Sequence, residues 1–196
     1  MTDYHNARAS GNINSGGRDG RGSMQYVEVV RSRKSVREFA DRPVEQEKLD
    51  YVLECARLAP SWANKQCWDF VVVSEPALLE RVVAASPNKW LADAPTIIVC
   101  CGTPTRSGSK RDIPYWAADV AIATEQLVLA ATDIGLGTCW VGIFDQGAVR
   151  VALDIPFDVQ ILALAPLGYP AENRAPRPDV SHGRRALDEI AHWNGW

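Results

Sequence analysis

The stretch WAADVAIATEQLVLAAT, residues 116–132, decides the fold of this chain. Its side chains are apolar on nearly every side of a helix, and only Asp119, Glu125 and Gln126 interrupt the pattern. A helix that is apolar all round is buried by several neighbours, whereas a surface helix has a single apolar stripe. We therefore expect a central helix, either in the core of the fold or at a contact between two chains. Because the stretch carries two carboxylates, we do not expect it to cross a membrane.

The sequence on both sides of this helix alternates between helical and strand patterns. Apolar residues at helical spacing predict helices, and short β-branched runs predict strands. The predicted helices cover residues 24–31, 43–58, 149–153 and a stretch after Pro76, and the predicted strands cover residues 69–74, 95–101, 138–142 and 159–167. Loops are expected over residues 61–67 and 102–114. Interleaved helices and strands without an internal repeat predict one layered domain of the α+β class.

Composition places the chain among ordinary globular domains. It has 196 residues, 46% of them hydrophobic, and a formal net charge of −3. For a chain of this mass, roughly 70% of the unfolded surface can be buried on folding. The weakly acidic charge argues against nucleic acid or an anionic membrane as the main partner. The five cysteines form no C-x-x-C pair and the N-terminus has no signal-peptide pattern, so we expect a cytoplasmic protein without a disulfide framework.

Residues 1–23 differ from the rest of the chain. They are rich in Gly, Ser and Asn and contain few apolar side chains. Such a segment cannot bury enough apolar surface to offset the entropy that ordering would cost. We expect residues 1–23 to be a flexible tail or leader and residues 24–196 to form the folded domain.

The sequence offers few candidate residues for a metal site or for a hydrolase active site. The three histidines, His5, His182 and His192, lie near the two ends of the chain, so we expect no metal site. A serine hydrolase would need a G-x-S-x-G turn, which the sequence lacks. The dinucleotide fingerprint also fails, because residues 135–137 read GLG but Trp140 stands where the third glycine is needed.

Four cations within seven residues stand out against the acidic background: Arg31, Arg33, Lys34 and Arg37. Guanidinium groups, an ammonium and the hydroxyl of Ser35 can together bind a phosphate through charge-assisted hydrogen bonds. A solvated basic surface is the alternative interpretation. A second basic pair, Arg184 and Arg185, could converge on the same anion.

The run RKSVREF, residues 33–39, resembles the opening R-R-S-V-R-x-F motif of the nitroreductase family of FMN flavoproteins. Further segments are similar to family motifs in the same order: ARLAPSWANKQCW (56–68), ADAP (92–95), GLGTCWVG (135–142), PLGYP (166–170) and HWNGW (192–196). The resemblance covers residues 24–196, so it identifies nearly the whole folded part as an FMN-binding domain. It implies a nitroreductase-like α+β fold, with a central mixed β-sheet flanked by helices, in an intertwined homodimer whose two FMN sites lie at the interface.

The resemblance also implies which residues bind FMN. Three groups carry over: a phosphate, ribityl and pyrimidine group of Arg33, Lys34, Ser35 and Arg37 with Arg184 or Arg185; a flanking loop with Pro60, Ser61, Asn64 and Gln66; and a ring segment of Cys139, Trp140, Val141 and Gly142. The backbone N–H of Gly142 would point to flavin N5, and no protein side chain is assigned a catalytic step. Trp62 and Trp140 are candidates for shaping the acceptor pocket.

Some residues depart from the family pattern. Cys67 stands where Pro is common, and Arg185 where Lys is more usual. Neither change removes a charge or an amide that the flavin needs. Trp62 is bulkier than the small residue typical at its position, and it could narrow the entrance to the flavin or pack against a partner chain.

The activity implied by the resemblance is reduction of nitroaromatic, quinone or similar electron-poor acceptors by NAD(P)H, in a ping-pong hydride mechanism with bound FMN. Alternatives within the same fold are other reductive chemistry, such as dehalogenation or enone reduction. A flavin-binding module without catalysis and an RNA- or DNA-binding protein that uses residues 31–37 are alternatives from other classes. The expected partners are a second copy of the chain and a small-molecule acceptor.

Overall fold

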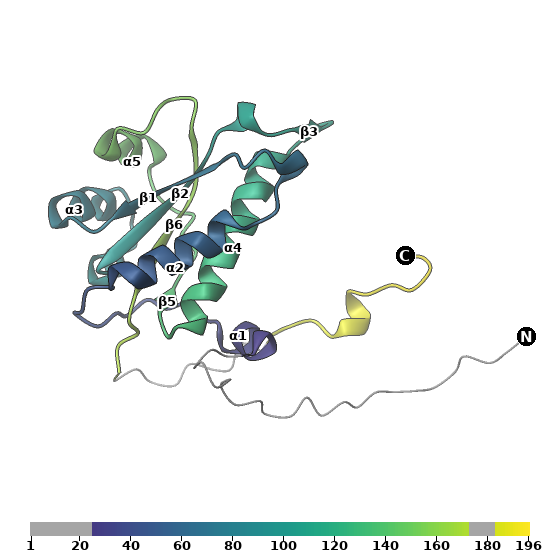
Figure 1. Cartoon of the computed structure of the whole chain (residues 1–196), viewed down its shortest axis with the longest axis horizontal. Coiled ribbons are helices and arrows are strands. Elements are labelled where there is room, and N and C mark those ends of the chain that lie inside the picture. Colours follow the sequence, from purple (N-terminus) through teal and green to yellow (C-terminus); the bar gives the residue numbers. More distant parts are fainter. Residues whose placement is uncertain (1–24, 173–182) are drawn as a thin grey trace, which may run out of the picture.

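The computed structural model describes residues 25–172 and 183–196 and places one β-sheet between two layers of helices (Figure 1). The sheet has four strands, in the order β1 (Trp68–Val73), β2 (Thr96–Gly102), β6 (Gln160–Gly168) and β5 (Gly137–Thr138). These neighbours pair antiparallel. A parallel bridge between Ser35 and Thr138 continues the sheet beyond β5 and gives it mixed character. The predicted α+β class is therefore confirmed.

Helices cover both faces of the sheet. One face carries α2 (Gln46–Arg57) and the long α4 (Tyr115–Asp133), with α1 (Tyr26–Ser32) packed against α4. The other face carries α3 (Pro76–Ala84) and α5 (Gln146–Leu153). Short 3-10 turns, η1 to η4, cover Trp62–Asn64, Lys89–Asp93, Pro104–Arg106 and Leu187–Glu189.

Strand β2 divides the core into two halves. Ile98 and Cys100 pack with the residues of α2 and α4, whereas Ile97, Val99 and Cys101 pack with those of α3 and α5. Every residue of β2 is buried. A strand that is covered on both faces is apolar throughout, and this explains the continuous apolar run that predicted it.

Helix α4 confirms the expectation of a central helix. Its buried residues include Val120, Leu127 and Ala131, and also Asp119, whose carboxylate lies inside the fold. One stretch of its surface remains accessible, since Ile122 is 43% exposed. Among the described residues, no helix is long and apolar enough to cross a membrane.

The structure corrects two of the expected segments. The strand predicted over 138–142 is limited to β5, followed by one bridge between Val141 and Leu164. The loop predicted over 102–114 contains η3 and a small hairpin of β3 (Ser109–Lys110) and β4 (Ile113–Pro114). Strands of two residues are too short to show an alternating pattern, so the sequence gives no signal for them. The tail predicted over residues 1–23 lies outside the described residues.

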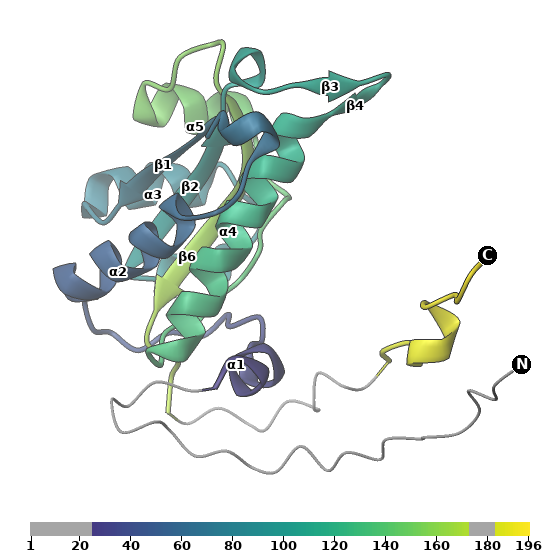
Figure 2. The ribbon, with the colours of Figure 1, turned by 45° about the vertical axis from the view of Figure 1, so that its right-hand side comes forward.

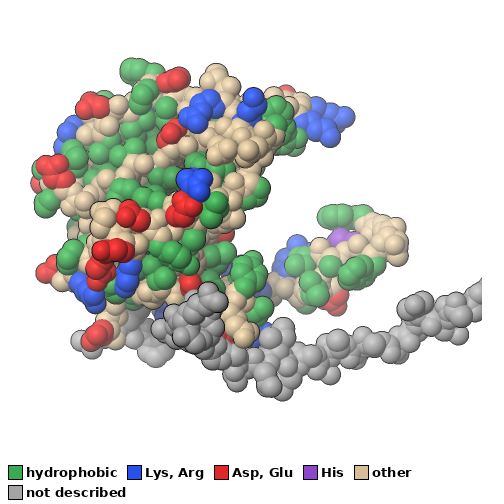
Figure 3. All heavy atoms as spheres, in the orientation of Figure 1, with side chains coloured by type: hydrophobic (Ala, Val, Ile, Leu, Met, Phe, Trp, Pro, Cys, Tyr) green, Lys and Arg blue, Asp and Glu red, His purple; other side chains and the backbone are tan. Residues whose placement is uncertain are grey.

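The C-terminal segment, residues 183–196, lies apart from the sheet in both ribbon views, and Figure 2 also shows it separated from the helices (Figures 1 and 2). Its large apolar side chains are exposed, from 56% for Ile190 to 85% for Trp193 and full exposure for Trp196. Figure 3 shows this segment as a separate body with apolar atoms on its surface. Apolar side chains that are gathered on such a segment mark an interaction surface.

Candidate functional site

The predicted phosphate-binding run lies directly beside β5. Helix α1 ends at Ser32, and the extended chain that follows forms the bridge from Ser35 to Thr138. The backbone N–H of Val36 donates to the carbonyl oxygen of Thr138 at 2.8 Å. A Cβ atom at Gly137 would lie 2.6 Å from Cγ2 of Val36, so this close approach requires glycine. The structure thus brings together two predicted segments that are about a hundred residues apart in the chain.

The cations of this run remain accessible beside the bridge. Val36 is buried in the core, whereas Arg33 and Arg37 are half-buried and Lys34 is exposed. The guanidinium carbon of Arg37 lies 5.9 Å from the centre of the Trp90 ring. The ion pairs found among residues 25–172 and 183–196 do not include Arg33 or Lys34. Cations that carboxylates do not neutralise can attract an anion.

Two further hydrogen bonds fix the run at its other end. The N–H of Ala40 donates to the carbonyl of Tyr169 at 2.8 Å, and the N–H of Ala171 donates to the carbonyl of Glu38 at 3.1 Å. The backbone of residues 35–40 is therefore held by β5 on one side and by the chain after β6 on the other.

The predicted ring segment, residues 139–142, presents mainly backbone atoms at the surface, where a ligand could contact them. The Cys139 side chain is buried in the core, so its thiol faces away from any ligand at the surface. Val141 exchanges two hydrogen bonds with Leu164, at 3.0 and 2.9 Å, and thereby ends the pairing with β6. Gly142 follows directly, is exposed, and has open space where a side chain would stand. A flat ligand can approach the backbone there. The Trp140 indole N–H donates to Oε2 of Glu125 on α4 at 3.0 Å.

The loop from Ser61 to Cys67 holds itself together by its own side chains. Oγ of Ser61 accepts from the N–H of Gln66 at 2.9 Å, and the Gln66 amide donates to Oδ1 of Asn64 at 3.2 Å. Ala63, Asn64 and Gln66 all have positive φ, at 46°, 55° and 48°. Residues other than glycine adopt this conformation at a cost, and such strain gathers at functional sites. Pro60, Asn64 and Gln66 are exposed.

Trp62 packs against its own chain. Its ring stacks on Tyr115, with centroids 6.5 Å apart, and covers Gly108, where a Cβ atom would lie 2.5 Å from the indole. The ring is still 43% exposed. It therefore packs the start of the loop against Tyr115, at the beginning of α4, and stays partly accessible to solvent.

Two residues that anchor this loop have no motif in the sequence. Asp119 accepts the backbone N–H of Trp62 at 2.8 Å, and Arg106 donates to the carbonyl of Gln66 at 3.0 Å. Burial and the negative charge of Asp119 raise the pKa of Cys67 to about 11. The sequence signal for Asp119 is its position as one of only three charged residues on a long, mainly apolar helix. Arg106 has no comparable signal.

The two halves of the predicted site lie at opposite ends of the sheet. The loop enters β1, one edge strand, at the level of Gly102 and Gln160, whereas Thr138 pairs with Leu167 beside the other edge. Seven residues of β6 separate these two levels, or roughly 20 Å at the rise of a strand. One chain therefore does not bring the loop and the predicted phosphate-binding run together.

The basic pair near the C-terminus belongs to the separate segment. Arg185 donates to the carbonyl of Glu189, and its Nε lies 4.0 Å from the Glu189 carboxylate. Both Arg184 and Arg185 are exposed. Within the described part of this chain, the pair is carried apart from the sheet and its edge (Figure 2).

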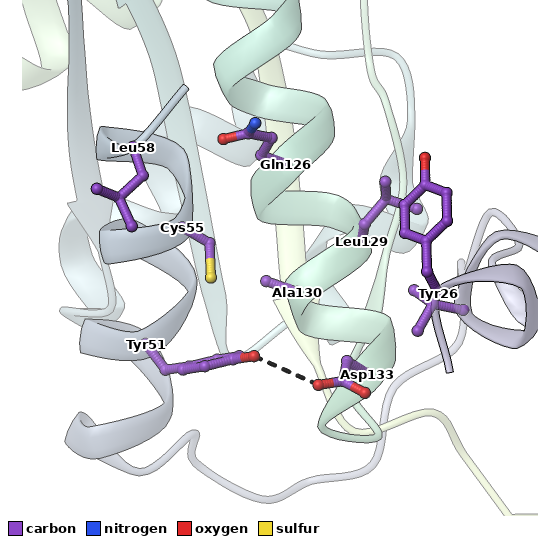
Figure 4. Close-up of a pocket in the computed structure, with 9 residues that line it drawn as sticks. Tyr26, Tyr51, Cys55, Leu58, Gln126, Leu129, Ala130 and Asp133 are labelled. Atoms are coloured by element: carbon purple, nitrogen blue, oxygen red, sulfur yellow. Dashed lines mark hydrogen bonds between the residues drawn. The ribbon is translucent and has the colours of Figure 1, made fainter. Parts of the chain in front are cut away.

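An apolar groove of about 430 Å³ runs between α2 and α4 and reaches α1 (Figure 4). The Tyr51 hydroxyl donates to Oδ2 of Asp133 across one end of it, at 3.3 Å. Tyr26 is 73% exposed and Leu58 64% exposed at this surface. The residues that line the groove are otherwise mainly apolar. Among the described residues, no group of three His, Cys, Asp or Glu side chains could hold a metal ion.

Comparisons with known proteins agree with this architecture. The profile of the nitroreductase family matches residues 30–87 and 84–169. A relative from Methanothermobacter thermautotrophicus, described as a "Putative NADH dehydrogenase/NAD(P)H nitroreductase", is 36% identical over an alignment of 170 positions that covers 81% of this chain and 86% of that protein. Iodotyrosine deiodinase 1 of Rattus norvegicus is 28% identical over 199 residues, covering 86% of this chain and 69% of its own.

Solved structures give the same result. An FMN-dependent nitroreductase from Clostridium difficile R20291 superposes with a TM-score of 0.74 and 26% identity, covering 87% of this chain and 99% of its own. Since the family profile spans most of the chain and the first relative exceeds 30% identity over four fifths of it, this protein is a member of the nitroreductase family.

Proposed function

We propose that this protein is an FMN-dependent oxidoreductase that uses NAD(P)H to reduce nitroaromatic, quinone or similar electron-poor acceptors. The observation that carries this proposal is the bridge from Ser35 to Thr138, which lays the cationic run beside β5, four residues before the exposed backbone at Gly142. The names of two relatives support the cofactor and the reductant, respectively.

The residues at this edge of the sheet fit FMN. Arg33 and Lys34 supply charge for a phosphate, and the Ser35 hydroxyl adds a hydrogen-bonding group next to them. The backbone of residues 140–142 offers a surface for the flat ring, and a backbone N–H there would donate to N5. Bound FMN would supply the redox chemistry, since it accepts two electrons as hydride and passes them to the acceptor. The nearby cations would favour the negatively charged reduced form.

A homodimer would complete the site. The loop with Ser61, Asn64 and Gln66 lies roughly 20 Å along the sheet from the phosphate-binding run, at the rise of a strand. A second copy related by a twofold axis can place its own loop beside the run of the first, since a twofold interface uses the same patches on both chains. The apolar groove on α2 and α4 and the exposed Trp193 and Trp196 provide the surface for such an interface. The partner's C-terminal segment would bring Arg184 or Arg185 to the phosphate.

Flavin uptake tests the proposal directly. The purified protein should be yellow, or should bind added FMN, and anaerobic NADH or NADPH should bleach the flavin absorbance. Turnover of nitrofurazone and menadione should then show ping-pong kinetics. A colourless protein that takes up no FMN contradicts the proposal, and bound FMN that neither nucleotide reduces indicates a flavin-binding module without catalysis.

Comparing Arg33→Ala with a second charge-removing variant tests whether Arg33 binds the FMN phosphate or acts only through its general positive charge. We expect Arg33→Ala to weaken FMN binding at least tenfold, because charge-assisted hydrogen bonds to phosphate are lost. The matched control is Arg31→Ala, which removes the same charge from the exposed surface of α1. Equal affinities in the two variants would refute the assignment.

Similarity to a deiodinase favours one second candidate, reductive dehalogenation of halogenated tyrosines. Turnover of iodotyrosine and bromotyrosine beside the nitroaromatic and quinone acceptors distinguishes the two. A kcat/KM for halotyrosine above that for every nitroaromatic and quinone would favour dehalogenation.

A further inference from the structure

Asp119 carries a buried carboxylate that contacts three residues from two other parts of the chain. The residue is only 4% exposed. Its Oδ1 accepts from the backbone N–H of Trp62 at 2.8 Å, and its Oδ2 accepts from the Ser107 hydroxyl at 2.7 Å. The Cys67 thiol lies 3.6 Å from the same Oδ2. A buried carboxylate is retained at a considerable desolvation cost, so this one calls for a structural or functional reason.

We propose that Asp119 is a positioning residue for the flavin. It holds residues 61–67 in the conformation that presents Ser61 and Asn64 to the ring. This role rests on the proposed function, because it assumes that the loop contacts FMN. Asp119 touches neither cofactor nor substrate itself.

The loop needs such an anchor because its own backbone is strained. Three of its residues have left-handed φ angles although none is glycine. Conformations of this kind persist only where the surroundings over-determine them. The bonds between Ser61, Asn64 and Gln66 are internal, so they shape the loop without tying it to the body. Asp119 supplies the tie at the start of the loop, and the Thr103 N–H, which donates to the Cys67 carbonyl at 2.8 Å, supplies one at its end.

The carboxylate is matched to the groups around it. The Trp62 N–H, the Ser107 hydroxyl and the Cys67 thiol can all donate, and an ionised carboxylate only accepts. The raised pKa of Cys67, to about 11, keeps the thiol protonated and thus a donor at neutral pH. An asparagine in this place would replace one accepting oxygen by an NH2 group, which only donates, and a leucine would leave all three donors without an acceptor.

The test compares Asp119→Leu and Asp119→Asn with a control that is destabilised elsewhere. Val82→Ala is the control, because Val82 is fully buried on α3, on the opposite face of the sheet. Hydrogen–deuterium exchange of the peptide that covers residues 58–68 reports on the loop whether or not flavin is bound. Dissociation of FMN from the purified holoprotein and the visible absorption band of the bound flavin report on the site.

We expect the loop of Asp119→Leu to exchange at least tenfold faster than wild type, and its FMN dissociation constant to rise at least tenfold with a shifted flavin band. Val82→Ala should lower the melting temperature and leave all three readouts unchanged. Should Asp119→Leu fail to fold, the nearly isosteric Asp119→Asn decides, with an expected rise of at least threefold in both exchange and dissociation constant.

Two results would overturn the role of Asp119 and leave the proposed function intact. One is wild-type exchange of residues 58–68 in the variants. The other is a loosened loop combined with an FMN dissociation constant and flavin band like those of Val82→Ala. A wild-type protein that binds no FMN overturns the proposed function, and the flavin role of Asp119 with it, even where exchange shows that Asp119 holds the loop.

Discussion

Gly137→Ala tests the contact on which the candidate site depends. A Cβ atom at this position would lie 2.6 Å from Cγ2 of Val36 and 2.8 Å from its Cβ and Cγ1, whereas ordinary van der Waals contacts begin near 3.4 Å. Gly137 is not among the described glycines with positive φ, so the clash is the main cost. Overpacking of this kind costs about 1–3 kcal/mol. For a domain of this size, the melting temperature should fall by roughly 2–12 °C.

The assay is thermal and urea unfolding, with FMN binding measured alongside. Val36→Ala removes two of the three atoms that clash, so the double variant should be less destabilised than the sum of the single variants by about 1 kcal/mol or more. Gly142→Ala is the matched control, because open space surrounds its position, and it should change stability by less than about 0.5 kcal/mol. FMN binding should weaken in Gly137→Ala, since displacement of Val36 moves the adjacent Ser35. A neutral Gly137→Ala, or strict additivity with Val36→Ala, would refute the placement of residues 33–37 on β5.

Three further predictions concern other parts of the molecule. The Tyr169 hydroxyl donates to the Glu45 carboxylate at 2.6 Å and is the largest of the causes that lower the pKa of Glu45 to about 2, so Tyr169→Phe should raise this pKa in an NMR titration. Because the pKa of Glu45 in the folded protein lies below the ordinary 4.5, its carboxylate stabilises the fold above pH 4.5, and this contribution is lost as the pH falls toward 2. Tyr169→Phe should therefore unfold at a higher pH in an acid titration, and an unchanged acid midpoint would contradict this. Asp119→Asn should lower the pKa of Cys67 and speed its alkylation at pH 9, whereas equal rates would show that the charge of Asp119 does not reach the thiol. In the homodimer proposed above, the exposed Trp193 would lie at the interface, so Trp193→Ser should shift that dimer toward monomer in sedimentation, and a dimer of unchanged affinity would exclude this side chain from the interface.

The elements that the sequence predicts well are those with a long or uniform pattern. The apolar stretch at 116–132 became α4, and the continuous apolar run at 95–101 became β2. Both patterns arise from burial on more than one side, and burial of this kind is visible in the order of residues alone. The cationic run at 33–37 was also detectable, because charge of one sign is concentrated there.

The parts that could not be predicted depend on contacts between distant residues. Trp62 and Asp119 are far apart in the chain, and nothing in the pattern around Asp119 indicates that its carboxylate accepts the N–H of Trp62. The separation of the loop from the predicted phosphate-binding run depends on strand order and register, which a single sequence does not encode locally. The hairpin at Ser109–Pro114 escaped prediction because each of its strands has only two residues.

The bonds that hold residues 35–40 also set the order of events during synthesis. This early segment is hydrogen-bonded to Thr138, Tyr169 and Ala171, so its folded conformation cannot form until the chain has been translated beyond residue 171. Contacts between residues so far apart in sequence form late and slow folding. On the ribosome, the cationic run would lack its backbone partners until the later strands of the sheet have been synthesised. FMN binding is therefore expected only after residues up to 171 have left the ribosome, and an arrested nascent chain that ends before β6 should bind no flavin.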